Sequence, residues 1–251
     1  MATKASPTGI KAVFFDIGGV CVQSPMLAIA EYEEALHMPA GYINYAISAA
    51  APSGAWQRLE RNEMSLDATF YSQFAKDIRR RPIWKRFHAE KGIQLLSYEA
   101  APPKVDGEKL FWNMMAKGQV QDKVVMTAVK RLREAGVVVG ALTNDYKYPD
   151  GHPYLKGKEE LRTLFDVYVS SAETGLRKPE AGFYKEAMKR VELKEDEGSK
   201  VAFLDDIGTN LKTAKELGWR TVRVHIGRTR EAVTELEGIV GLPLLEERSK
   251  L

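Results

Sequence analysis

Short apolar runs alternate along this chain with segments whose apolar residues recur at the spacing of a helix. The apolar runs have the length of strands buried on both faces, and they occupy residues 11–15, 137–142, 167–169, 201–204 and 221–224. The segments with helical spacing occupy residues 122–134, 180–191 and 209–217. Strands and helices that alternate in this way form a parallel sheet with helical crossovers. The pattern therefore predicts an α/β fold with a Rossmann-like core.

The stretch between residues 25 and 118 has a different pattern. It lacks runs typical of buried strands and contains amphipathic segments, such as residues 28–36 and 66–78, separated by prolines and glycines. We therefore predict an all-helical cap over residues 25–118, inserted into a core formed by residues 10–24 and 119–251. Because the insertion follows the first strand, the cap should lie over the carboxyl ends of the strands, where it can exclude water and select substrates.

Aromatic side chains are frequent in the predicted cap. They can form a hydrophobic wall for a substrate or the core of the cap itself, and we favour the core for most of them. The residues concerned are Trp56, Phe70, Tyr71, Trp84 and Trp112.

Composition limits the function classes. The chain has 251 residues, 44% of them hydrophobic, and a formal net charge of +3, which is too small and dispersed for nucleic-acid binding. A basic cluster at residues 79–86 fits a solvated helix face, with a surface for an anionic partner as the alternative. The single cysteine, Cys21, excludes an internal disulfide, and its apolar neighbours indicate a buried thiol.

The two ends of the chain bear on its location. The first nine residues lack the apolar segment of a signal peptide, and no stretch is long enough to span a bilayer, so we expect a soluble protein. The last three residues, Ser249, Lys250 and Leu251, match the peroxisomal address that an import receptor reads at a free carboxyl terminus. The sequence therefore predicts a peroxisomal location with that receptor as a partner. An accidental match and a cytosolic location are the alternative.

A carboxylate follows the first predicted strand directly. Asp16 comes after Phe15 and before Gly18 and Gly19. Ligands of open α/β sheets bind at the carboxyl ends of the strands, and glycines let a loop approach a ligand closely. This placement predicts that Asp16 is presented as a nucleophile. An ordinary turn, in which Asp16 caps a backbone group, is the alternative.

Two further segments place polar side chains at the same edge. Thr143 and Asn144 end the second predicted strand, and Lys178 precedes Pro179, which can begin the next helix. A hydroxyl, an amide and an ammonium can all bind phosphate oxygens, so these residues predict an anion site. A strand-end hydroxyl that satisfies the backbone and an ordinary surface lysine are the alternatives. The polar loop at residues 144–151 either lines the entrance of the site or is a plain surface loop.

Two adjacent carboxylates, Asp205 and Asp206, follow the predicted strand at residues 201–204. They would repel each other there unless a cation or a base lies beside them. A hard divalent ion with oxygen ligands removes the repulsion, and Mg²⁺ suits such a site. The alternative is that one carboxylate caps the helix predicted from residue 209, and Asn210 can also bond in that loop.

Together these motifs resemble the haloacid dehalogenase superfamily of hydrolases, in its phosphatase branch with a helical cap. The matching segments follow the order of the family, and they are FFDIGGV, LTN, RKPE and FLDDIGTN. More closely, the chain is similar to the N-terminal phosphatase domain of soluble epoxide hydrolases and to the N-terminal region of some acyl-CoA dehydrogenase family proteins. This likeness runs from about Lys11 to Leu236 and is weakest through the cap.

The resemblance implies a phosphatase mechanism. Asp16 would accept the phosphoryl group of a small or lipid-like phosphate ester as an aspartyl phosphate. The residues that would hold phosphate oxygens are Thr143, Asn144, Lys178 and Gly19. Phosphoryl transfer depends mainly on alignment and charge neutralisation, which these groups would supply.

The resemblance also implies how Mg²⁺ would be held. Its ligands would be Asp16, Asp206 and the backbone carbonyl of Gly18. Asp205 would support both the ion and the lysine of the third motif, and Asn210 would brace the loop.

Gly18 departs from the pattern of the family. Phosphatases of this family usually carry an aspartate at that position, where it protonates the leaving oxygen and later deprotonates water. Such acid/base help contributes about 10²–10⁴ in rate. If the resemblance to the phosphatase branch holds, the protein would be a phosphatase for good leaving groups, such as acyl, anomeric or diphosphate esters, or one whose cap or substrate supplies the acid.

Two alternatives remain at this stage. The first is a phosphate-binding module without turnover. The second is a metal-independent 2-haloacid dehalogenase, which the adjacent acids at 205 and 206 disfavour because dehalogenases of this superfamily work without Mg²⁺.

Overall fold

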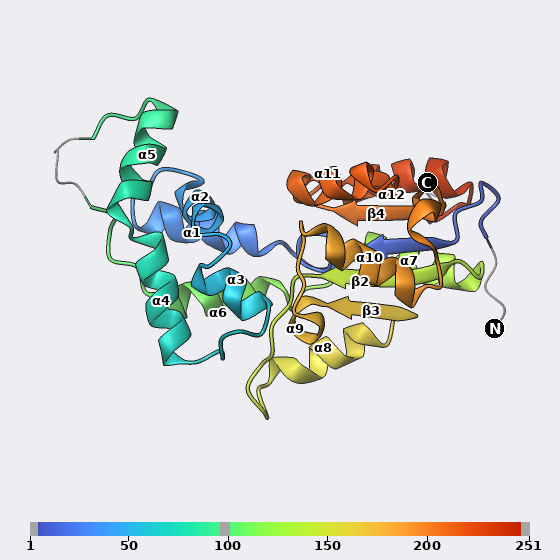
Figure 1. The fold of residues 1–251 in the computed structure, drawn as a ribbon, viewed down its shortest axis with the longest axis horizontal. Helices are drawn as coiled ribbons and strands as arrows, with labels where there is room; N and C mark the ends of the chain where they lie inside the picture. Colours follow the sequence, from blue (N-terminus) through green and yellow to red (C-terminus); the bar gives the residue numbers. More distant parts are fainter. Residues whose placement is uncertain (1–4, 96–100, 247–251) are drawn as a thin grey trace, which may run out of the picture.

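The computed structural model describes residues 5–95 and 101–246. A helical cap and a core built on one parallel sheet lie end to end along the long axis (Figure 1). The predicted fold class, a Rossmann-like core with an all-helical cap, is confirmed. Within the described ranges, no helix is long and apolar enough to cross a membrane.

Parallel strands form the sheet of the core in the order β3-β2-β1-β4-β5. They are β1 (Ala12–Phe15), β2 (Val138–Thr143), β3 (Val167–Ser170), β4 (Val201–Asp205) and β5 (Arg220–Arg223). β1 is central, and Phe15 pairs with Ala141 of β2 and with Leu204 of β4. This register brings the carboxyl ends of β1, β2 and β4 to one edge of the sheet.

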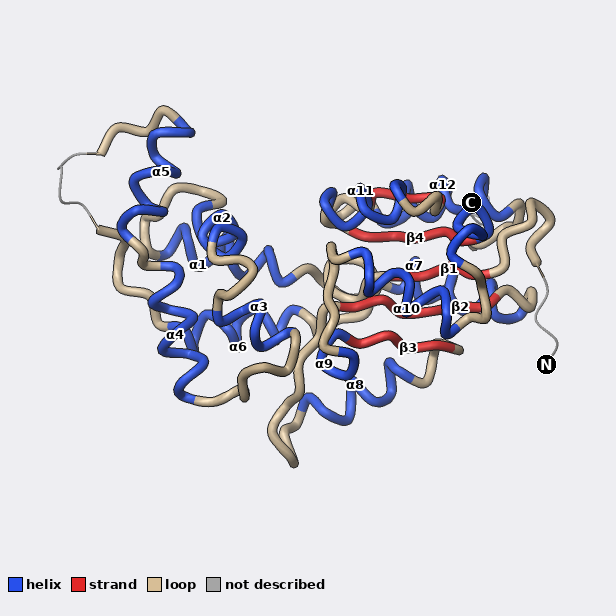
Figure 2. Tube along the Cα trace, viewed as in Figure 1, coloured by secondary structure: helices blue, strands red, loops and turns tan. Residues whose placement is uncertain are grey.

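Helices cover both faces of the sheet (Figure 2). Val13 and Phe15 pack on one face, against α7 (Lys123–Glu134), α8 (Tyr154–Arg162) and α12 (Thr229–Val240). Phe14 packs on the other face, against α10 (Ala181–Arg190) and α11 (Gly208–Glu216). Both faces of β1 are therefore buried, which explains its unbroken apolar sequence. The remaining short helices of the core are α9 (Ser171–Thr174) and η1 (Glu195–Lys200).

The predicted core elements agree with the structure to within about a residue at most ends. The strands expected at residues 137–142 and 221–224 lie at Val138–Thr143 and Arg220–Arg223. The helices expected in the core correspond to α7, α10 and α11. Helices α8 and α12 were not predicted.

The cap consists of short helices with a core of their own. They are α1 (Pro25–Ala35), α2 (Tyr42–Ala49), α3 (Ala55–Glu60), α4 (Ala68–Ile78), α5 (Arg81–Lys91) and α6 (Gly107–Lys117). Phe70 stands at the centre of the cap, with ring centroids 5.5 Å from Phe74 and 5.4 Å from Phe111. Most of the cap aromatics thus stabilise the cap itself, as the sequence indicated.

The basic cluster of the cap is exposed and locally paired. Arg80 binds Asp77 at 2.5 Å, and Arg86 donates to the Tyr45 hydroxyl at 2.7 Å. These contacts fit the interpretation of a solvated helix face. Cys21 is buried and unpaired, as expected of a thiol inside an apolar run.

Candidate active site

Three carboxylates converge at the edge where β1 and β4 end. They belong to Asp16, Asp205 and Asp206, and one oxygen of each lies within 4.8 Å of the others. All three residues are buried. The parallel register of β1 and β4 explains the convergence, because both strands end at the same edge. The structure thus brings the predicted nucleophile and the predicted metal ligands into one cluster.

Lys178 lies between two of these carboxylates. Its Nζ is 2.8 Å from Asp16 Oδ1 and 2.8 Å from Asp205 Oδ2, and its side chain is only 1% exposed. One ammonium cannot balance three buried carboxylates, so the ionised cluster retains an excess of negative charge. The site is therefore suited to a further positive charge.

The pKa values of the cluster reflect this imbalance. Burial raises the pKa of Asp16 to about 8, against the opposing effect of Lys178. Burial also raises the pKa of Asp206 to about 6, and the nearby charge of Asp205 adds to the rise. Burial lowers the pKa of Lys178, but its ion pairs with Asp16 and Asp205 outweigh this effect, and the net pKa is raised. Without a cation the cluster retains protons near neutral pH, and a divalent ion would have to displace them.

The residues of the cluster fit Mg²⁺. Asp206 Oδ1 is buried and has no hydrogen-bond partner, so it is free to bind an ion. All available donors are oxygens, which hard divalent cations prefer. Gly19 makes room for this carboxylate, because a Cβ there would overlap Asp206 Oδ2, and its φ of +83° lies in the region that favours glycine.

Asp205 differs from Asp206 because its oxygens are already engaged. Oδ1 accepts from the backbone N–H of Ile207 at 2.7 Å, and Oδ2 accepts from Lys178 Nζ at 2.8 Å. Asn210 Nδ2 donates to both oxygens, at 3.1 and 3.0 Å. Asp205 is thus placed to hold Lys178, and Asn210 braces Asp205; the roles in catalysis that the resemblance implies for these residues stay predictions.

Thr143 is the last residue of β2 and Asn144 follows it, next to the loop that carries Lys178. Thr143 is buried at the strand end. The side chain of Asn144 makes two hydrogen bonds with the main chain of Lys178, accepting from its N–H at 2.8 Å and donating to its carbonyl at 3.1 Å. Asn144 therefore positions the backbone of the lysine, and direct phosphate binding by its amide stays a prediction.

A cavity of about 280 Å³ lies between the cap and the core, beside Thr143 and Asn144. Gly18 and Thr143 line it from the core, and Trp56 and Met114 line it from the cap. The loop expected at the entrance contributes further lining residues, which are Asn144, Asp145, Tyr146 and Tyr148. The wall is mainly apolar and aromatic, so the cavity suits the apolar part of a small ligand.

Gly18 lines this cavity, and nothing in the structure requires a glycine there. A Cβ at this position would lie 3.5 Å from Pro25 Cδ, an ordinary van der Waals contact. Its φ is also outside the left-handed region, in contrast to the φ of Gly19. Packing around position 18 therefore leaves room for a Cβ.

Several residues at the site were missed by the sequence reasoning. Ser24 donates to Asp206 Oδ2 at 3.4 Å, although its position suggests only an N-cap of α1. Lys158 of α8 binds Asp145 Oδ1 at 2.7 Å and the Tyr146 carbonyl at 2.6 Å, which fixes the cavity loop. Neither contact leaves a local signal, because each joins segments that meet only in the folded chain.

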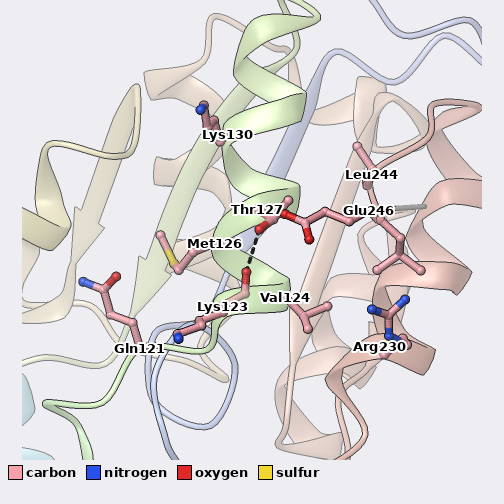
Figure 3. Close-up of a pocket in the computed structure, with 10 residues that line it drawn as sticks. Gln121, Lys123, Val124, Met126, Thr127, Lys130, Arg230, Leu244 and Glu246 are labelled. Carbon is pink, nitrogen blue, oxygen red and sulfur yellow. Dashed lines mark hydrogen bonds between the residues drawn. The ribbon is translucent and has the colours of Figure 1, made fainter. Parts of the chain in front are cut away.

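A second cavity, of about 470 Å³, lies elsewhere on the core (Figure 3). It is bordered by α7, by Arg230 of α12 and by the segment that carries Leu244 and Glu246. Lys123 and Lys130 give it a partly basic rim. None of its lining residues belongs to the carboxylate cluster. The candidate catalytic and metal-binding groups therefore lie at the other cavity, which faces the cap.

Comparisons with known proteins agree with this geometry. A family model described as haloacid dehalogenase-like hydrolase matches residues 10–218. Together with the sheet and its capped edge, this match defines the class of the protein as a capped α/β hydrolase. The chain belongs to the haloacid dehalogenase-like hydrolase family.

Curated relatives share the sequence over most of this chain. Mouse acyl-CoA dehydrogenase family member 10 is 30% identical over 243 residues, which cover 96% of this chain and 20% of the relative. Pig bifunctional epoxide hydrolase 2 is 26% identical over 240 residues, which cover 94% of this chain and 40% of the relative. The chain thus spans less than half the length of either protein.

A shorter match and a solved structure add to this picture. Glyceraldehyde 3-phosphate phosphatase of Methanocaldococcus jannaschii is 31% identical over 100 residues, covering 40% of this chain and 42% of the relative. An enzyme of the same family from Bacteroides thetaiotaomicron, solved with magnesium and inorganic phosphate, has a TM-score of 0.50 at 17% identity. That match covers 87% of this chain and 96% of the other. At this identity the structural likeness supports the fold.

Proposed function

We propose that this hydrolase is a Mg²⁺-dependent phosphatase that removes phosphate from a small or lipid-like phosphate ester through an aspartyl phosphate. One observation carries the proposal: Asp16 directly follows β1, and its Oδ1 lies 2.8 Å from Lys178 Nζ inside a carboxylate cluster with excess negative charge. A phosphatase and an enzyme crystallised with magnesium and phosphate among the similar proteins support this assignment.

The reaction would begin with attack of an Asp16 oxygen on phosphorus. The new bond joins this oxygen to phosphorus, the bond from phosphorus to the leaving oxygen breaks, and water later cleaves the aspartyl phosphate to release inorganic phosphate. Lys178 and Thr143 would neutralise the phosphate oxygens. Mg²⁺, held by Asp16, Asp206 and the Gly18 carbonyl, would supply charge neutralisation at the phosphoryl group.

The cavity narrows the class of substrate. Its volume of about 280 Å³ lies just below the range of about 300–1,000 Å³ typical of ligand pockets. Its apolar wall favours a compact hydrophobic group next to the phosphate. Because Gly18 supplies no proton to the leaving oxygen, we propose substrates whose leaving group departs without one, such as acyl phosphates or diphosphates.

A phosphate-binding module without turnover is the second candidate. Gly18 favours it, because Asp16, Thr143, Lys178 and Asp206 can bind phosphate in the absence of the usual acid. A 2-haloacid dehalogenase fits less well, because the metal-suited carboxylates would have no purpose in that reaction.

Metal dependence tests the proposed function. We expect phosphate release from acyl phosphates and diphosphates in Mg²⁺ and none in EDTA. Because protons on Asp16 and Asp206 compete with the ion, the Mg²⁺ concentration for half-maximal rate should fall as the pH rises from 6 to 8. The decrease should approach about tenfold per pH unit for each proton displaced. Phosphate binding without release would favour the module, and metal-independent halide release would favour a dehalogenase.

We further propose delivery to peroxisomes through the import receptor. The motif that supports it, Ser249 to Leu251, lies outside the described residues. A fluorescent fusion that ends in this tripeptide should give a punctate pattern that overlaps a peroxisomal marker, and deletion of the tripeptide should make the signal diffuse. The same pattern with and without the tripeptide would contradict the proposal.

A further inference from the structure

A buried ion pair joins the cap to the loop that carries Lys178. Glu60, the last residue of α3, accepts a hydrogen bond on Oε2 from Arg177 Nε at 2.7 Å, and Arg177 Nη2 forms an ion pair with the same oxygen at 2.6 Å. The side chains are only 6% and 15% exposed, respectively. Arg177 directly precedes Lys178, and α3 contacts α9 of the core. The cap is thus attached to the core next to the lysine that binds Asp16.

The same carboxylate also holds a wall of the cavity. Glu60 Oε1 accepts from Trp56 Nε1 at 2.9 Å, and Trp56 lines the cavity together with Gly18 and Thr143. One carboxylate oxygen of Glu60 therefore binds the indole of Trp56, and the other binds Arg177. A single side chain fixes the position of the indole relative to the phosphate end of the site.

This pair depends on both partners. Burial raises the pKa of Glu60, and Arg177 opposes that rise by stabilising the carboxylate. Each buried charge is compensated by the other while the cap lies against the core, and loss of one partner in that position would leave the other buried and unpaired. The arrangement favours one closed position of the cap.

A second ion pair across the same boundary is much weaker. Arg61 lies 3.9 Å from Glu180, whose side chain is 43% exposed, and Arg61 makes a shorter contact of 2.6 Å with Glu63 of the cap. Long, exposed ion pairs contribute little. This pair serves as a matched control, because it joins the same two parts of the molecule without reaching the cavity.

We propose that Glu60 is a positioning residue that, through Arg177 and Trp56, locks the cap over the core and sets the selectivity for the apolar part of the substrate. The inference rests on the proposed function for its selectivity part. Substrates whose apolar group reaches the indole would bind more tightly when the cap is held in this position. Substrates with a very small group would not.

The position of the cap can be measured without turnover. Spin labels at Lys91→Cys of α5 and Lys212→Cys of α11 report the distance from cap to core, since both sites are exposed and the native Cys21 is buried. We expect a narrow distance distribution in the parent protein and a broader one with Glu60→Gln. Glu180→Gln should leave it narrow. An unchanged distribution with Glu60→Gln would overturn the lock, whether or not the protein is a phosphatase.

Selectivity is measured with two acyl phosphates that differ in their apolar group, acetyl phosphate and benzoyl phosphate. With Glu60→Gln we expect KM for benzoyl phosphate to rise about tenfold, which is the effect of about 1.4 kcal/mol. The kcat for benzoyl phosphate and both constants for acetyl phosphate should stay within about threefold. An equal loss for both substrates would indicate a general structural effect and overturn the selectivity role.

The double variant Glu60→Gln/Arg177→Met is the control for misfolding of the single variant. It removes both charges and leaves neither unpaired, so it should be destabilised less. It should broaden the distance distribution as Glu60→Gln does, and its thermal midpoint reports whether it folds. If all proteins lack turnover but the distances respond as expected, the phosphatase proposal fails and the lock stands. If the double variant folds and keeps the parent distribution, the lock is wrong.

Discussion

Replacement of Asp16 by Asn is expected to lower phosphate release by at least about 10³-fold, because a neutral amide cannot attack phosphorus as the carboxylate does. The change conserves size. It also leaves Lys178 paired with Asp205 at 2.8 Å, so the lysine keeps a partner. Loss of activity would therefore reflect the missing nucleophile and not a collapsed site.

The covalent intermediate gives a direct measurement. Acid-quenched parent protein should carry one phosphoryl group on the peptide that contains Asp16, and Asp16→Asn should carry none. The matched control is Asp122→Asn in the same core, since Asp122 caps α7 through Val124 and Val125 and asparagine caps equally well. This control should stay within about twofold of the parent rate. Turnover by Asp16→Asn close to the parent rate would show that another group is the nucleophile.

The sequence was sufficient for the core because burial on both faces leaves a strong local signal. β1 is apolar at every position, and it is enclosed by helices on each side. α8 was missed because its sequence, YLKGKEELR, is largely charged and only Leu161 is buried, so its helical spacing is weak. For β1 and α8, the strength of the sequence pattern thus follows how completely the element is buried.

The chemical groups were also predictable, most directly where a strand end positions them. Asp16 and Asp205 stand at the ends of adjacent parallel strands, and the topology alone brings them to one edge. Asn144 shows the limit, since its bonds to the backbone of Lys178 depend on two loops that meet in space. The pair of Glu60 and Arg177 is similar, because it joins residues 117 positions apart and no spacing rule indicates it.

The two adjacent glycines after Asp16, Gly18 and Gly19, differ in the space around them and in backbone conformation. Gly19 must be glycine, because a side chain there would overlap Asp206 Oδ2, whereas Gly18 has room for a Cβ and an ordinary φ. Of two adjacent glycines, only one is required by the geometry of the loop. Under the proposed function, the other, Gly18, would decide which leaving groups the site can process.

Replacement of Gly18 by Asp is therefore expected to accelerate hydrolysis of alkyl phosphate monoesters by about 10²–10⁴-fold, which is the usual contribution of general acid/base catalysis. The new side chain would arise on the wall of the cavity that, under the proposed function, receives the leaving group. The neighbouring carboxylates would raise its pKa, which favours the protonated form that a general acid needs. Acetyl phosphate, whose leaving group needs no proton, should gain little.

The matched control for this gain is Gly18→Asn, which has nearly the same shape but no acidic proton to donate. Steady-state rates of both variants on an alkyl phosphate and on acetyl phosphate separate acid catalysis from a change of fit, since a change of fit would affect Asp and Asn alike. Equal Mg²⁺ affinity in calorimetry would show that the loop is intact. If Gly18→Asp folds, binds Mg²⁺ and gives no selective gain, then the cap or the substrate already supplies the proton. Gly18 would then not be the residue that limits the range of substrates.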